Sequence, residues 1–124
     1  MMTKRSLVVV VDDDESVRES LPDLLGELGF AVHTFPSGEE FLASDFIAHA
    51  SCLILDIAMP GMSGPDLQAE MTRRGHVVPI IFITAHEDGG IRRSVMERGA
   101  VDCLFKPFSE SALLGALNTA LRVA

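Results

Sequence analysis

Five short apolar runs, separated by longer segments with helical spacing, constrain the fold of this chain more than any other feature of its sequence. They cover residues 7–11, 31–35, 52–55, 80–83 and 101–105. Each has the length of a strand, and most are rich in β-branched residues, which favour extended backbone. The first, third and fourth runs are apolar at every position. Strands of this kind are buried on both faces, so these runs predict a parallel sheet with helices on both sides.

The segments between the runs carry apolar residues every three or four positions, as amphipathic helices do. Capping signals agree with the expected helix boundaries: a serine precedes two helical segments, and a glycine follows three of them. These residues are Ser37, Ser109, Gly29, Gly75 and Gly99. Strand and helix alternate five times, which predicts a doubly wound α/β fold, a (βα)5 three-layer sandwich.

The chain is 124 residues long, and globular domains typically have roughly 100 to 200 residues. The sequence has no linker, repeat or low-complexity stretch, so we expect a single domain over residues 1–124. Two segments fit the helical pattern less well. Pro22 lies inside the first helical segment and is expected to kink that helix. The second helical segment, around Phe41, is short and poorly patterned.

The charge balance limits the partners of this domain. Ten Lys and Arg residues against 18 Asp and Glu residues leave a net charge of −8. Such a surface repels phosphate backbones and anionic lipids, so we expect no nucleic acid and no membrane to be bound by this domain. Cys52 and Cys103 lie in apolar stretches without a metal-ligand spacing. They indicate reduced, buried thiols, as is typical of a cytoplasmic protein.

Polar residues follow four of the apolar runs. Ligands of open parallel sheets bind outside the carboxyl ends of the strands, so these residues should meet at one edge. They are Asp12, Asp13, Asp14 and Glu15 after the first run, Asp56 after the third, Thr84 after the fourth and Lys106 after the fifth. Several carboxylates in a shared site repel one another, and a hard divalent cation relieves this repulsion. Mg²⁺ prefers one or two carboxylates together with waters and phosphate oxygens, so the edge predicts a magnesium site beside a phosphoryl group.

Two of these acids have a simpler explanation. Asp14 and Glu15 stand at the expected start of the first helix. Carboxylates there cap free backbone amides and complement the helix dipole. We therefore expect them to be capping residues and not ligands.

Four segments together resemble the receiver domain of two-component response regulators, the CheY-like family. They are Val-Asp-Asp at 11–13, Leu-Asp-Ile-Ala-Met-Pro-Gly-Met-Ser-Gly at 55–64, Ile-Thr-Ala at 83–85 and Lys-Pro-Phe at 106–108. The resemblance covers essentially the whole chain, and Gly-Ala-Val-Asp at 99–102 is closest to receivers of FixJ-type transcriptional regulators. It implies a five-stranded parallel sheet of order 2-1-3-4-5.

The resemblance also implies a role for each residue at the edge. Asp56 would accept a phosphoryl group from a phosphohistidine or a small phosphodonor. Mg²⁺ would be held by Asp12, Asp13 and Asp56 together with the backbone carbonyl of Ala58. Thr84 would donate its hydroxyl to the phosphoryl group. Lys106 would pair with a phosphate oxygen, and a cis Lys106–Pro107 bond would point its ammonium back at the carboxylates.

Further expectations concern partners. The family resemblance implies a cognate sensor histidine kinase and a cytoplasmic protein that is not a multiple-turnover enzyme in the usual sense. Homodimerisation through the fourth helix, fifth strand and fifth helix, about residues 90–122, is a family property that this sequence leaves open. The same holds for a DNA-binding domain beyond the carboxyl end of the chain.

One position departs from the family. A Tyr or Phe usually stands three residues before the lysine and changes rotamer together with the threonine. Here that residue is Cys103, which is too small to move in the same way. The departure leaves open a pseudo-receiver, a binding module that keeps the fold without regulation by phosphorylation.

A phosphatase of the haloacid-dehalogenase type is a second alternative, because Asp12 and Asp14 follow the first strand and Thr84 and Lys106 come in a similar order. That family needs a further acidic pair beyond the lysine. Only Glu110 follows Lys106, and the chain has no room for a cap domain. The receiver interpretation is therefore favoured.

Overall fold

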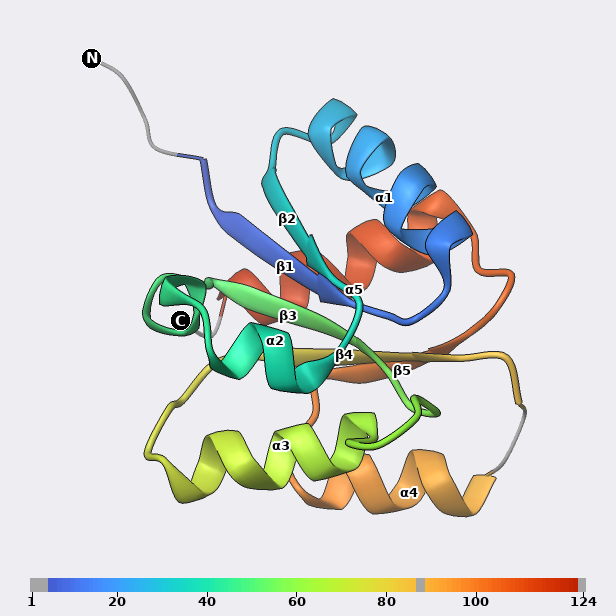
Figure 1. The fold of residues 1–124 in the computed structure, drawn as a ribbon. Coiled ribbons are helices and arrows are strands. Elements are labelled where there is room, and N and C mark those ends of the chain that lie inside the picture. Colours follow the sequence, from blue (N-terminus) through green and yellow to red (C-terminus); the bar gives the residue numbers. More distant parts are fainter. Residues whose placement is uncertain (1–4, 87–88, 123–124) are drawn as a thin grey trace.

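A single parallel sheet forms the centre of the computed structural model, which describes residues 5–86 and 89–122 (Figure 1). Strands and helices alternate along the chain in the expected order. The strands are β1 (Leu7–Val11), β2 (Ala31–Phe35), β3 (Cys52–Asp56), β4 (Ile80–Thr84) and β5 (Asp102–Phe105). The helices are α1 (Glu15–Glu27), α2 (Gly38–Leu42), a 3-10 turn (Asp45–Ala48), α3 (Gly64–Arg73), α4 (Gly89–Glu97) and α5 (Glu110–Arg122). The strand order is β2-β1-β3-β4-β5, which confirms the predicted (βα)5 topology.

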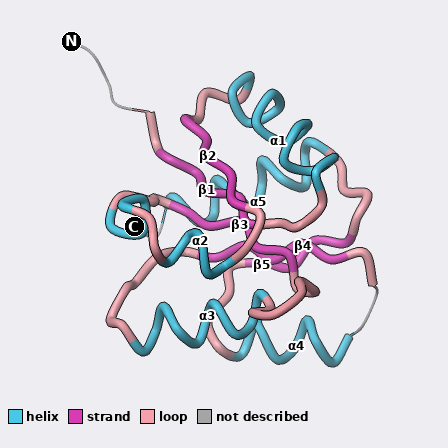
Figure 2. The backbone as a smooth tube through the Cα atoms, viewed as in Figure 1, coloured by secondary structure: helices cyan, strands magenta, loops and turns pink. Residues whose placement is uncertain are grey.

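Helices lie on both faces of the sheet (Figure 2), and a hydrophobic core fills the space between the sheet and the helices on each face. Alternate residues of β1 enter opposite cores, because successive side chains of a strand point to opposite faces. Val9 and Val11 pack with α2, α3 and α4, whereas Val8 and Val10 pack with α1 and α5. Every residue of β3 and β4 is buried, as the apolar runs 52–55 and 80–83 predict for all but the last residue of each strand.

The boundary signals act as expected. Ser37 caps α2 and Ser109 accepts a hydrogen bond from the amide of Ala112 in the first turn of α5. Gly29, Gly75 and Gly99 follow α1, α3 and α4 with φ between 79° and 99°, which only glycine adopts readily. The second helix is short, as expected, and a 3-10 turn follows it. The first helix extends over 13 residues and continues through Pro22.

No helix in residues 5–86 or 89–122 is both long enough and apolar enough to cross a membrane. The carboxyl ends of the strands all point toward the same edge of the sheet, on the right in Figure 1. The loops that follow β1, β3, β4 and β5 therefore meet there. This edge carries the polar residues that the sequence singled out.

Candidate functional site: an acidic edge with one lysine

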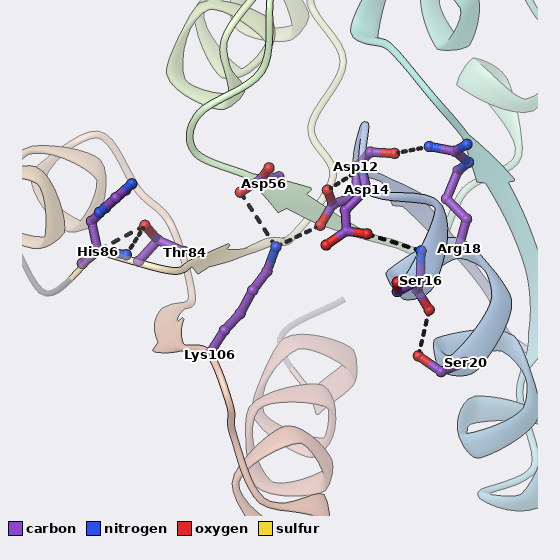
Figure 3. Close-up of polar contacts among 9 residues, drawn as sticks. All are labelled: Asp12, Asp14, Ser16, Arg18, Ser20, Asp56, Thr84, His86 and Lys106. Atoms are coloured by element: carbon purple, nitrogen blue, oxygen red, sulfur yellow. Dashed lines mark hydrogen bonds and ion pairs between the residues drawn. The ribbon is translucent and has the colours of Figure 1, made fainter.

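Asp12 is the most completely bonded residue of the edge. It is fully buried, and each of its backbone and carboxylate polar groups has a partner. Its amide donates to the carbonyl of Phe35, and its carbonyl accepts from Nη1 of Arg18 at 2.8 Å. Its Oδ1 accepts from the amide of Asp14, and its Oδ2 accepts from Nζ of Lys106, both at 2.9 Å. A buried carboxylate needs such partners, and Asp12 is accordingly held in one orientation (Figure 3).

Three carboxylates converge at this edge. One ligand oxygen from each of Asp12, Asp13 and Asp56 lies within 4.8 Å of the other two. Asp12 and Asp56 are buried, while Asp13 is exposed and makes no hydrogen bond or salt bridge with another described residue. Oxygen donors at this spacing, one of them free and open to solvent, are the donor set that Mg²⁺ takes. The residues present therefore fit the predicted metal.

Lys106 brings the positive charge to the edge. Its Nζ lies 2.9 Å from Oδ2 of Asp12 and 3.8 Å from Oδ1 of Asp56, so it bridges the two buried carboxylates (Figure 3). The Lys106–Pro107 bond is cis, as the resemblance implied. One ammonium against three carboxylates leaves the cluster short of positive charge.

The protonation of Asp56 reflects this shortage. Burial, together with repulsion from Asp12 and Asp13, raises the pKa of its carboxyl group to about 7, although the nearby Lys106 acts in the opposite direction. Asp56 is buried, at 7% exposure for the whole residue, and lies at the end of β3 before the loop of residues 57–63. An added cation would favour the ionised form, which is the nucleophilic form of a carboxylate.

The hydroxyl of Thr84 faces away from Asp56. It lies at the end of β4, is 2% exposed, and accepts a hydrogen bond from the amide of His86 at 3.1 Å. The same hydroxyl is 3.4 Å from the carbonyl of His86, to which it can donate (Figure 3). The structure thus places Thr84 at the predicted edge with its hydroxyl bonded to the following loop. Its contact with a phosphoryl group stays a prediction.

The remaining predicted residues lie where the sequence placed them. Asp14 caps α1 by accepting from the amide of Ser16, and it is outside the group of three convergent carboxylates. Ala58 is exposed in the loop after β3, and the role of its carbonyl stays a prediction. Cys103 is a free thiol with 2% exposure, packed in the core on the α3 and α4 side.

Two residues of the site were not singled out from the sequence. Arg18 is an ordinary arginine of a surface helix by its spacing, and only the fold shows that it reaches the carbonyl of Asp12. Gly64 begins α3 so close to β3 that a Cβ atom there would lie 2.3 Å from the carbonyl oxygen of Asp56. The signal for Gly64 was its place between a capping serine and a proline, Ser63 and Pro65.

Comparison with known proteins agrees with this site. The chain is 41% identical to the response regulator protein TmoT of Ectopseudomonas mendocina, over 100% of this chain and 56% of TmoT. It is 39% identical to the transcriptional regulatory protein FixJ of Azorhizobium caulinodans, over 92% of this chain and 54% of FixJ. A crystal structure of FixJ-N superposes with a TM-score of 0.88 at 35% identity, over 98% of each chain.

The chain thus spans about half the length of these curated relatives. The family model of the response regulator receiver domain matches residues 8–118, which include all the residues gathered at the edge. The chain therefore belongs to the response regulator receiver domain family.

Proposed function

We propose that this domain is switched by Mg²⁺-dependent transfer of a phosphoryl group to Asp56. The observation that carries the proposal is the convergence of three carboxylates within 4.8 Å, with Nζ of Lys106 3.8 Å from Asp56. Asp56 is the carboxylate that ends the central strand, next to Lys106 and at the accessible end of the sheet. Family membership supports the same assignment.

Each residue of the site would have its own role in the transfer. Asp12, Asp13 and Asp56, with the carbonyl of Ala58, would hold Mg²⁺, which neutralises charge on the transferring phosphoryl oxygens. An oxygen of Asp56 attacks phosphorus, the N–P bond of the donor phosphohistidine breaks, and the imidazole leaves with its electron pair. Lys106 exchanges its contact with Asp12 for one with a phosphoryl oxygen, and Thr84 turns its hydroxyl from His86 toward another. Water later hydrolyses the acyl phosphate, which releases phosphate and restores the carboxylate.

The test is phosphorylation with acetyl phosphate, followed by intact-mass spectrometry. We expect one phosphoryl group per chain in the presence of Mg²⁺ and none after chelation with EDTA. Asp56→Asn should carry no adduct, because an amide oxygen is a far weaker nucleophile than a carboxylate. Asp45→Asn, an acid in the 3-10 turn after α2, is the matched control and should be modified like wild type.

Two results would overturn the proposal. An adduct that persists in Asp56→Asn would place the phosphoryl group elsewhere. Absence of any adduct with Mg²⁺ and acetyl phosphate would favour a pseudo-receiver. A phosphatase of the haloacid-dehalogenase type would instead turn over a phosphate monoester, which we expect this chain not to do.

The partners follow from the same proposal. The phosphodonor in the cell would be a cognate sensor histidine kinase, and this domain would act in the cytoplasm. Relatives such as FixJ are transcriptional regulators about twice as long as this chain. We propose that a longer form of this protein carries a DNA-binding domain after residue 124. Homodimerisation through α4, β5 and α5 remains a prediction, which sedimentation with and without beryllium fluoride would test.

A further inference from the structure

We propose that Arg18 is a positioning residue for the Mg²⁺ site, because it fixes the peptide group that aims the carboxylate of Asp13. The inference rests on the proposed function for the identity of the cation. The observation that carries it is the hydrogen bond of 2.8 Å from Nη1 of Arg18 to the carbonyl oxygen of Asp12 (Figure 3).

Asp13 depends on its backbone for its direction. Asp12 is held by four partners, and Asp56 lies at the end of a fully buried strand. The carboxylate of Asp13, in contrast, is exposed and has no hydrogen bond or salt bridge in the part of the chain that the structure describes. Its position within 4.8 Å of the other two carboxylates is therefore set by the backbone that carries it.

Hydrogen bonds hold the backbone on both sides of Asp13. A peptide group is planar, so holding its carbonyl or its amide holds the whole plane. Arg18 holds the carbonyl of Asp12, and with it the plane that enters Asp13. Oδ1 of Asp12 holds the amide of Asp14, and with it the plane that leaves Asp13. The two planes together define φ and ψ of Asp13 and so the direction of its Cβ.

Whether Mg²⁺ affinity rises or falls when Arg18 is replaced distinguishes between two possible roles of this residue. Removing a positive charge beside an acidic cluster strengthens the attraction of the cluster for a cation, if charge is all that matters. Removing a group that orients a ligand weakens binding, and the loss of such supporting contacts typically costs about 10- to 100-fold in metal affinity. The two roles therefore predict opposite changes for Arg18→Gln.

The experiment is a titration of the unphosphorylated protein with Mg²⁺, followed by amide chemical shifts. The chain has no Trp or Tyr, so heteronuclear NMR replaces intrinsic fluorescence. We expect Arg18→Gln to raise the dissociation constant for Mg²⁺ by about tenfold. The amides of Asp13 and Asp14 should shift in the metal-free variant. Arg18→Lys, which keeps the charge and one donor, should fall between the variant and wild type.

Arg93→Gln is the matched control, because it removes the same charge from an exposed position on α4. It should leave the dissociation constant close to that of wild type. Thermal unfolding of each variant shows whether it is folded at the temperature of the titration. The dissociation constants are then compared between folded proteins only, so that a loss of affinity cannot come from unfolding. An unchanged or lowered dissociation constant in Arg18→Gln would overturn the proposal. Failure of Asp56 to accept phosphate would contradict the proposed function and leave this binding result standing.

Discussion

Asp56, the proposed phosphoacceptor, is a buried carboxyl group beside two other carboxylates, which makes its ionisation unfavourable. Burial and the neighbouring carboxylates raise its pKa to about 7 in the metal-free protein. A carboxyl group whose pKa is raised on folding binds more protons in the native state than in the unfolded chain. The contribution of Asp56 to the free energy of unfolding is fully present below the pKa that the group has in the unfolded chain, near 3.8. This contribution is lost as the pH rises through about 7, the pKa in the folded protein. At neutral pH and above, the ionised group therefore destabilises the fold.

Asp56→Asn should accordingly stabilise the protein in EDTA. We expect the free energy of unfolding to rise by about 1–2 kcal/mol near pH 8 and by less than half as much near pH 5, because there the folded carboxyl is still protonated while the unfolded one is already ionised. Urea unfolding at both pH values measures this. Asp23→Asn, at an exposed position of α1, should show no such pH-dependent gain. A destabilised Asp56→Asn at high pH would contradict the expected repulsion.

The two cysteines should be nearly inert in the folded protein. Cys52 is fully buried and Cys103 is 2% exposed. Burial raises the pKa of the Cys52 thiol to about 12 and also raises that of Cys103, so neither forms much thiolate at neutral pH. We expect Ellman's reagent to label both at least about a hundredfold more slowly than in urea-unfolded protein. Rapid labelling of Cys103 in the native protein would show that β5 opens readily.

At the scale of the elements, the start of α3 positions the loop of residues 57–63, which follows Asp56. The amide of Gly64 donates to the carbonyl of Ile57 at 3.0 Å, which closes the loop after β3. Ser63 caps the helix and forms a reciprocal capping box with Asp66. The close approach of Gly64 to the carbonyl of Asp56 and to the ring of Phe82 leaves no room for a side chain. A shift at the start of α3 would therefore move Asp56, the proposed phosphoacceptor, as well.

Gly64→Ala tests this junction. Its Cβ would lie 2.3 Å from the carbonyl oxygen of Asp56 and 2.9 Å from the ring of Phe82, so backbone must shift. We expect a loss of about 1–3 kcal/mol in the free energy of unfolding, as for other overpacked sites, and slower phosphorylation by acetyl phosphate. Gly115→Ala, in the middle of α5 with nothing within 4 Å of the added Cβ, should instead gain about 0.5–1 kcal/mol. Equal effects of the two substitutions would contradict the expected clash.

These elements also show what the sequence could and could not predict. The strands were predictable because β1 is apolar throughout, and β3 and β4 are apolar up to the polar residue that ends each of them. Parallel strands bring their carboxyl ends to one edge of the sheet. The convergence of Asp12, Asp13, Asp56 and Lys106 followed from that geometry. The hydrogen bond from Arg18 to the carbonyl of Asp12 and the close approach of Gly64 to the carbonyl of Asp56 depend on how a helix packs against a strand. Periodicity does not encode such distances.

For the whole molecule, the charge of −8 has two parts that respond differently to cations. Most acids are solvated and spread over the surface, where added salt screens their repulsion without regard to the kind of cation. The carboxylates of Asp12, Asp13 and Asp56 are concentrated within 4.8 Å, where a divalent ion can bind to all three at once. Only this second part should distinguish Mg²⁺ from an inert salt of the same ionic strength.

Mg²⁺ should therefore stabilise the entire domain through this one site. A ligand that binds only the folded state adds RT ln(1 + [L]/Kd), which is about 1.4 kcal/mol at a tenfold excess of free Mg²⁺ over Kd. We expect thermal unfolding to move to a higher temperature in MgCl₂ than in NaCl of matched ionic strength. Asp13→Asn should lose this difference and retain the response to NaCl, because the surface charges remain. The same shift in both salts for wild type would mean that the acidic edge only adds to the overall charge and does not bind a specific ion.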